Sequence, residues 1–67
     1  IDHIKIFAPI NEDLNYQVLD AMGNVIINRS FRSSTTVDTR RLPWGNYYLA
    51  VYRYSRLYVQ PIIKTSR

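Results

Sequence analysis

The fold is decided by residues 42–53, which read Leu-Pro-Trp-Gly-Asn-Tyr-Tyr-Leu-Ala-Val-Tyr-Arg. The stretch opens on a compact turn, in which Pro43 pre-sets φ and Gly45 supplies a conformationally permissive position. From Tyr47 onward the residues alternate between two faces with the period of two that is typical of a strand. One face then carries Tyr47, Leu49 and Val51. The stretch therefore predicts a turn followed by a strand over residues 47–53.

The spacing of Leu42, Gly45 and Tyr47 is that of the tyrosine corner found in Greek-key sandwiches. In that motif the tyrosine hydroxyl bonds a backbone group a few residues upstream and anchors the crossing between two sheets. We expect Tyr47 to play this part, with Gly45 allowing the close approach of the chain. The alternative is an ordinary turn followed by a buried tyrosine.

The same alternation recurs outward from this stretch, toward both ends of the chain. Residues 14–31 read as a hairpin with a loop of four or five residues around Asp20 and Gly23. Gly23 can take a positive φ without steric cost, and the Asp20 carboxylate can cap the turn amides. Further strands are predicted at residues 3–6, 35–39 and 57–63. Pro61 cannot donate to a ladder, so the last strand lies at an edge or carries a bulge.

The composition agrees with strands throughout. Val, Ile and Thr total seventeen residues and aromatics nine, against three Ala and one Glu. Six short strands at roughly ten-residue spacing predict an all-β chain, a small antiparallel Greek-key, immunoglobulin-like β-sandwich. No linker or repeat interrupts it, so we expect one domain over residues 1–67.

Several classes of protein are excluded by what the chain lacks. With no cysteine and one histidine among 67 residues, neither a disulfide framework nor a zinc site is available. No apolar run approaches the ~20 residues of a membrane span. The chain has no initiating Met and no leader, so we expect a mature product or an excised fragment. Stability must therefore come from packing of the 46% of residues that are hydrophobic.

No residues with the pattern of a catalytic, cofactor-binding or metal site stand out. His3 is the sole imidazole, and Asp2 beside it points to the opposite face of a strand, so it cannot orient the ring. Glu12 and Asp13 are adjacent, whereas a metal loop needs several more oxygens at fixed offsets. Asp20 and Asp38 lie beside turns, where capping explains them. We therefore expect no enzyme, no cofactor and no metal.

Two longer motifs point to a family. Residues 16–26 resemble the "strand, Asp, two residues, Gly, basic or polar residue, two aliphatics" signature of the C-terminal sorting domains of the type IX (Por) secretion system of Bacteroidetes. Residues 36–51 are similar to the second half of that family, with its Leu-Pro-x-Gly-x-Tyr turn, and Ile62-Ile63-Lys64 fits its last strand. The matches cover about residues 14–64. A related small secreted immunoglobulin-like domain of Bacteroidetes shares the same pattern.

The resemblance implies a role and a place. It implies a non-enzymatic sorting module, recognised by outer-membrane export machinery and removed by a sortase-like peptidase. The parent protein would be secreted, periplasmic or on the surface of a Gram-negative bacterium. Recognition would use an exposed surface, and an unpaired edge can accept a partner strand. The predicted partner-binding edge is the last strand with the basic tail, namely Leu57, Tyr58, Val59, Ile62, Ile63, Lys64 and Arg67.

Other roles stay open from the sequence. The same edge could support a homodimer, and the module could be a free-standing adhesive or accessory domain that binds a surface protein. Residues 52–58 interleave tyrosines with arginines, the combination used by binders of single-stranded nucleic acid. That function requires Tyr52, Tyr54 and Tyr58 to line one exposed face. The net charge of +4 is ordinary for the solubility of a small domain, so we do not expect nucleic acid as the partner.

Overall fold

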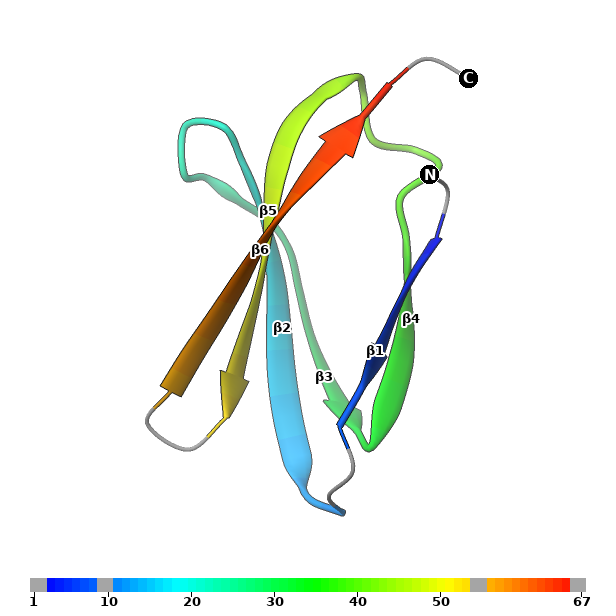
Figure 1. Cartoon of the computed structure of the whole chain (residues 1–67), viewed down its shortest axis with the longest axis vertical. Coiled ribbons are helices and arrows are strands. Elements are labelled where there is room, and N and C mark those ends of the chain that lie inside the picture. The colour runs from blue at the N-terminus through cyan, green and yellow to red at the C-terminus, as the bar shows by residue number, and fades with distance from the viewer. Residues whose placement is uncertain (1–2, 9–10, 54–55, 66–67) are drawn as a thin grey trace.

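The computed structural model describes residues 3–8, 11–53 and 56–65, and these form six strands (Figure 1). The strands are β1 (His3–Phe7), β2 (Asp13–Asp20), β3 (Val25–Arg32), β4 (Ser34–Asp38), β5 (Gly45–Arg53) and β6 (Arg56–Lys64). No helix occurs among the described residues. The prediction of an all-β chain is confirmed. The predicted strands lie within one or two residues of the observed ones, because β-branched and aromatic residues fill the strands and Gly, Asp and Pro fill the turns.

The strands follow the order β1-β4-β3-β2-β5-β6, and every pair is antiparallel. β3 and β4 share only the pair Arg32↔Ser34. At this junction Ser33 has a φ of 69°, so the chain turns sharply between the two strands. The ladder therefore folds over into two antiparallel sheets, one of four strands (β3-β2-β5-β6) and one of two (β4-β1).

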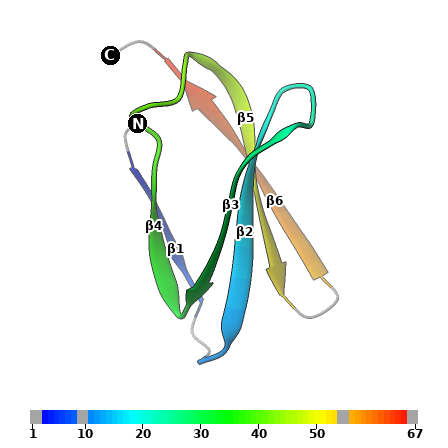
Figure 2. The same cartoon turned by 180° about the vertical axis from the view of Figure 1, so that it is seen from behind.

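The two sheets are closed on one side and open on the other. Figure 1 looks at the open side, where β1 and β6 lie nearest the viewer, and Figure 2 looks from behind, at β3 and β4. The amide of Ala8 donates to the carbonyl of Ser33 at 2.7 Å, which ties the end of β1 to the β3–β4 junction. We call the side that carries β1 and β6 the open side.

The core lies between the sheets and follows the predicted alternation. The larger sheet contributes Leu14, Tyr16 and Val18 from β2 and Tyr47 and Leu49 from β5, all buried. The smaller sheet contributes Ile6 and Val37, and the aromatic rings of Tyr16 and Phe31 pack with centroids 6.0 Å apart. Because side chains alternate across a strand, residues that lie between these core positions face outward.

One irregularity was not predicted from the sequence. The register of β2 against β3 shifts between Val18 and Leu19: Val18 pairs with Ile27, and Leu19 pairs with Val25. Ile26 is the extra residue of this β-bulge, and it is exposed. A run of three aliphatic residues carries no alternation that would reveal which of them is extra, so only the pairing decides it.

Candidate functional site

The turn before β5 holds the hydroxyl of Tyr47. This hydroxyl donates a 2.6 Å hydrogen bond to the carbonyl oxygen of Pro43, four residues upstream. The Tyr47 side chain is buried, and Leu42 packs against the same core. Gly45 has a φ of 147°, a conformation that side chains rarely adopt. A hydrogen bond from a tyrosine hydroxyl to a backbone carbonyl a few residues upstream is the contact expected of a tyrosine corner.

The turn between β2 and β3 is organised by Asp20. One carboxylate oxygen accepts the backbone amides of Met22 and Asn24, both at 2.9 Å, and the other accepts the side-chain amide of Asn24 at 3.1 Å. Gly23 completes the turn with a φ of 89°. The hydrogen bonds from Asn24, first from its backbone amide and then from its side chain, lower the pKa of Asp20 below its ordinary value. These contacts show that the Asp20 carboxylate stabilises the turn between β2 and β3.

Two other carboxylates form ion pairs with arginines. Asp13 and Arg32 form an ion pair of 3.1 Å between β2 and β3. Asp38 pairs with Arg40 at 2.8 Å, and this guanidinium, followed by the Arg40 backbone amide, holds the pKa of Asp38 well below its usual range. Within residues 3–8, 11–53 and 56–65, no cluster of three or more His, Asp or Glu side chains could hold a metal ion.

The predicted partner-binding edge is only partly exposed. β6 ends the strand order, and Leu57, Tyr58, Val59 and Ile63 on it are exposed. Ile62, in contrast, is 5% exposed and belongs to the core, so its assignment to an exposed edge is wrong. It pairs with Tyr47, and both side chains therefore face the smaller sheet. Lys64 is half-buried, whereas Arg67 and the predicted connection at Tyr54 and Ser55 lie outside the described residues.

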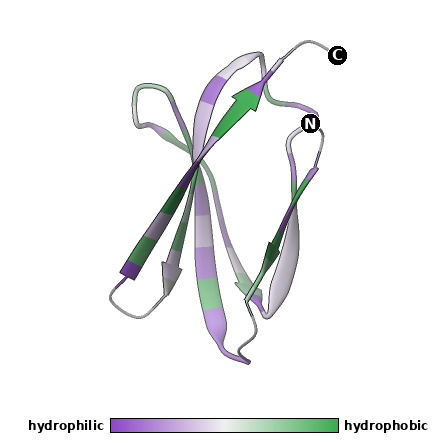
Figure 3. Ribbon diagram, in the orientation of Figure 1, coloured by the Kyte–Doolittle hydropathy of each residue, from purple (hydrophilic) through white to green (hydrophobic). Residues whose placement is uncertain are grey.

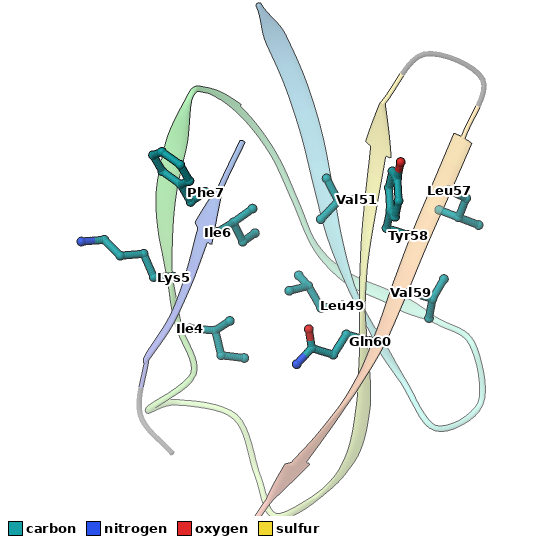
Figure 4. A pocket seen from close by; sticks show the side chains of 10 residues that line it. All are labelled: Ile4, Lys5, Ile6, Phe7, Leu49, Val51, Leu57, Tyr58, Val59 and Gln60. Carbon is teal, nitrogen blue, oxygen red and sulfur yellow. The ribbon is translucent and has the colours of Figure 1, made fainter. Parts of the chain in front are cut away.

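A groove of about 550 Å³ runs along the open side, between the two sheets. Figure 4 shows Ile4 and Ile6 of β1 directed across it toward β5 and β6, while Lys5 and Phe7 point the other way. The far wall is lined by Leu49 and Val51 of β5 and by Tyr58 and Gln60 of β6. Figure 3 colours part of β1 and much of β6 as hydrophobic. The groove is thus an apolar extension of the core that opens to solvent.

The outer face of the larger sheet carries a second apolar surface. Tyr48, Tyr52, Leu57 and Val59 are exposed there on neighbouring strands, and we call these four residues the outer patch. Leu19 and Ala50, together with the outer patch, line a hollow of about 380 Å³ on this face. Exposed contiguous apolar surfaces of this kind often mark interaction sites.

The aromatic residues proposed for nucleic-acid stacking do not share a face. Tyr52 pairs with Leu57, and Val51 pairs with Tyr58. Because paired residues point to the same side of a sheet, Tyr52 lies on the outer face and Tyr58 faces the groove. The requirement for Tyr52 and Tyr58 on one exposed face is not met, and Tyr54 lies outside the described residues.

Sequence reasoning missed the groove. The sequence predicted a strand over residues 3–6, but not which strands it would meet. The structure pairs β1 with β4, more than thirty residues later, with Ile4 opposite Val37. This pairing leaves β1 facing β5 and β6 across the groove, and a single sequence holds no local signal for it.

Two packed antiparallel sheets with open edges and exposed apolar surfaces have the features of a binding or recognition module. A comparison with protein families identifies the kind of recognition module. The family model described as "Secretion system C-terminal sorting domain" matches residues 2–65, so the chain belongs to the family of type IX secretion C-terminal sorting domains. No match was found among curated proteins or among solved structures.

Membership of this family indicates the general role of the chain. The chain carries a sorting signal for type IX secretion, which is read by the secretion machinery, and the protein that bears it is a secreted or cell-surface protein. The family is one of sorting signals and is not an enzyme family. Over the described ranges there is no helix with the length and hydropathy needed to cross a membrane.

Proposed function

We propose that residues 1–67 form one folded sorting signal. The outer-membrane export machinery of a Gram-negative bacterium recognises this signal, and a sortase-like peptidase then removes it. The observation that carries the proposal is the match of the sorting-domain family over residues 2–65.

The fold of this sorting signal is proposed to be an immunoglobulin-like Greek key. In a Greek key, three consecutive strands are followed by a fourth that returns beside the first. The strand order β4-β3-β2-β5 supports this assignment, since β5 returns by the connection at residues 39–44 to lie beside β2. The hydrogen bond from Tyr47 to Pro43 supports it as well.

The recognition surface is proposed to be the exposed part of β6 with the basic end of the chain. Leu57, Val59 and Ile63 are exposed on this edge strand, and Lys64 and Arg67 add positive charge at its end. A partner can pair with an unpaired edge through its backbone and read the side chains beside it.

A second candidate function is favoured by one observation, the outer patch. A free-standing accessory domain that adheres to another surface protein would use such an exposed aromatic and aliphatic surface. Both functions predict a protein partner, but only the sorting function predicts that the chain directs the export of an unrelated protein.

Fusion to a reporter separates the two. The chain is attached behind a secreted reporter with a signal peptide, in a bacterium that has type IX secretion, and reporter in the medium and on the cell surface is measured. We expect export and release of the 67-residue chain by proteolysis. Reporter that stays in the periplasm with the chain attached would refute the sorting function.

Point variants test the surface without removing a strand. The double variant Leu57→Glu, Val59→Glu places charges on exposed positions of β6. The matched control is Val25→Glu, Ile26→Glu, which changes two exposed aliphatic residues on β3. We expect export to fall severalfold in the first variant and to stay near wild type in the second. Equal export by the two would contradict the assignment to β6.

A further inference from the structure

On the open side of the sandwich, a position for a further strand of the smaller sheet is vacant. The larger sheet has four strands and the smaller sheet two, so part of the inner face of β6 is left uncovered. Tyr58 shows the consequence, because it faces the groove and is still 49% exposed. In contrast, Leu49 faces the same space from β5 and is 5% exposed. The inner face of β6 is thus buried at Ile62, which is 5% exposed, and open at Tyr58.

The vacant position lies beside the free edge of β1. β1 pairs with β4 along one edge, and it ends the strand order, so its other edge has no described strand partner. A strand added there would lie about 4.8 Å from β1 and about 10 Å above β6, which are the usual spacings within and between sheets. It would cover the groove that Ile4, Ile6, Val51 and Tyr58 line.

The two free edges differ in their capacity to accept a strand. β6 contains Pro61, which lacks an amide hydrogen and is one of the residues that protect sheet edges. β1, with the sequence His-Ile-Lys-Ile-Phe, contains neither proline nor glycine. The backbone of β1 can therefore pair along its whole length.

Charge restricts what the occupant can be. The three strands around the groove, β1, β5 and β6, contain Lys5, Arg53, Arg56 and Lys64 and no Asp or Glu. Lys5 is exposed, points away from the groove and forms no ion pair with a described residue. A second copy of the chain would bring the same cations to the same edge, and like charges opposite each other in a sheet are destabilising.

We infer that the open side binds an extended acidic segment of another protein, which pairs with the free edge of β1. Its apolar side chains enter the groove, and its Asp and Glu side chains project on the opposite face, on the side of Lys5. This site on the edge of β1 is additional to the recognition surface proposed on β6. The inference rests on the proposed sorting function only for the identity of the protein that supplies the segment.

A synthetic probe tests the inference on the 67-residue chain itself. The probe is a fluorescent peptide of alternating Glu and Val, nine residues long like β6 and blocked at both ends. The comparison peptides are an alternating Lys and Val peptide and a block peptide with the composition of the probe. Fluorescence anisotropy measures affinity, and amide chemical shifts locate the binding. We expect the alternating acidic peptide to bind most tightly and to shift the β1 amides.

Two charge reversals give a matched pair. Lys5→Glu changes a cation on β1, and Arg29→Glu changes an exposed cation on β3, which β2 and β5 separate from β6. Both variants lower the net charge equally, so non-specific attraction to the peptide falls equally. We expect Lys5→Glu to weaken binding roughly tenfold, because a favourable cross-strand pair becomes a repulsive one, and Arg29→Glu to change it less than about twofold. Thermal melting confirms that both variants fold.

Several results would overturn the inference. They are no binding of the acidic peptide, equal binding of the Lys and Val peptide, equal weakening by the two variants, or a dimer of the chain that protects the β1 amides by itself. The outcomes are independent of the export assay. Export of the reporter without peptide binding would refute the acidic-strand inference and leave the sorting function standing. Peptide binding without export would refute the sorting function.

Discussion

At the scale of single residues, three sets of polar contacts hold the ends of strands in place. Tyr47 bonds the backbone of Pro43, Asp20 bonds the amides of its own turn, and Arg32 joins Asp13 to the carbonyl of Asn11. Each contact binds a strand to the turn beside it. Such contacts position the connections, while the apolar residues between the sheets supply the driving force.

The Tyr47 hydroxyl provides the first prediction. Tyr47→Phe removes a partly buried hydrogen bond of 2.6 Å to Pro43 and keeps the ring in the core. We expect a loss of about 1 kcal/mol of unfolding free energy, the usual net value of such a bond. Chemical denaturation measures it. Tyr48→Phe, at an exposed position of the same strand, is the control and should change stability little. Equal stability of the two variants would show that the hydroxyl contact contributes nothing.

The Asp20 carboxylate provides a prediction on pH. Its pKa is lower in the folded state than its ordinary value of 3.8, because the Asn24 hydrogen bonds favour the charged form. The stability from this difference is present in full above the unfolded pKa and is lost as the pH falls through the folded pKa. In Asp20→Asn this dependence is absent. We expect the variant to melt at a lower temperature than wild type at neutral pH, by a difference that shrinks below about pH 4. A difference that stays constant between pH 7 and pH 2 would contradict the assignment.

At the scale of elements, β6 combines two environments on neighbouring residues. Ile62 is 5% exposed and faces the smaller sheet, whereas Ile63 is 67% exposed on the opposite face. The chemistry of the two side chains is identical, so any difference between them comes from their position. The strand is therefore part of the core at one residue and part of the surface at the next.

This contrast gives a prediction with an internal control. Ile62→Ala should cost about 2–5 kcal/mol of unfolding free energy, because it removes buried methylene groups and leaves a cavity. Ile63→Ala should change the same quantity by less than about 0.5 kcal/mol, as is usual for surface positions. Denaturant unfolding of both variants is the measurement. Similar losses in the two would mean that β6 packs in a different register.

At the scale of the whole molecule, the two sheets depend on one shared core. Val18 on β2 and Val37 on β4 are both fully buried, one from each sheet. Among the described residues, the smaller sheet is joined to the larger one by the strand pair Arg32↔Ser34, by the hydrogen bond from Ala8 to Ser33 at their junction, and by packing of the core. A two-stranded sheet is marginal in water by itself, so β1 and β4 need the larger sheet to stay folded.

Because of this dependence, we expect the two sheets to unfold together. Measuring whether they do tests whether residues 1–67 are one domain. Val37→Ala should destabilise the molecule by about 2 kcal/mol and lower its melting temperature by roughly 8 °C or more. Hydrogen exchange should show the amides of β1 and β4 losing protection together with those of β2 and β5. The opposite result, in which β1 and β4 exchange early while β2 and β5 keep wild-type protection, would show that the sheets unfold separately.

The prediction from the sequence succeeded where the signal was local. The alternation in β5 placed Tyr47 and Leu49 on one face, and both are buried. It failed at Ile62, because the segment Pro61-Ile62-Ile63 has no alternation of apolar and polar residues. The register with β5 decides that Ile62 faces inward, and a register is a property of two strands.

The chain by itself therefore determined the strands, the turns and the resemblance to sorting domains, because each of these depends on residues close together in the sequence. The sharp turn at Ser33, the pairing of β1 with β4 and the groove on the open side were decided by the tertiary structure. The physical reason is the distance along the chain between the residues involved. Strands far apart in sequence meet only when the sheets pack, so the vacant position beside β1 exists only in the folded molecule.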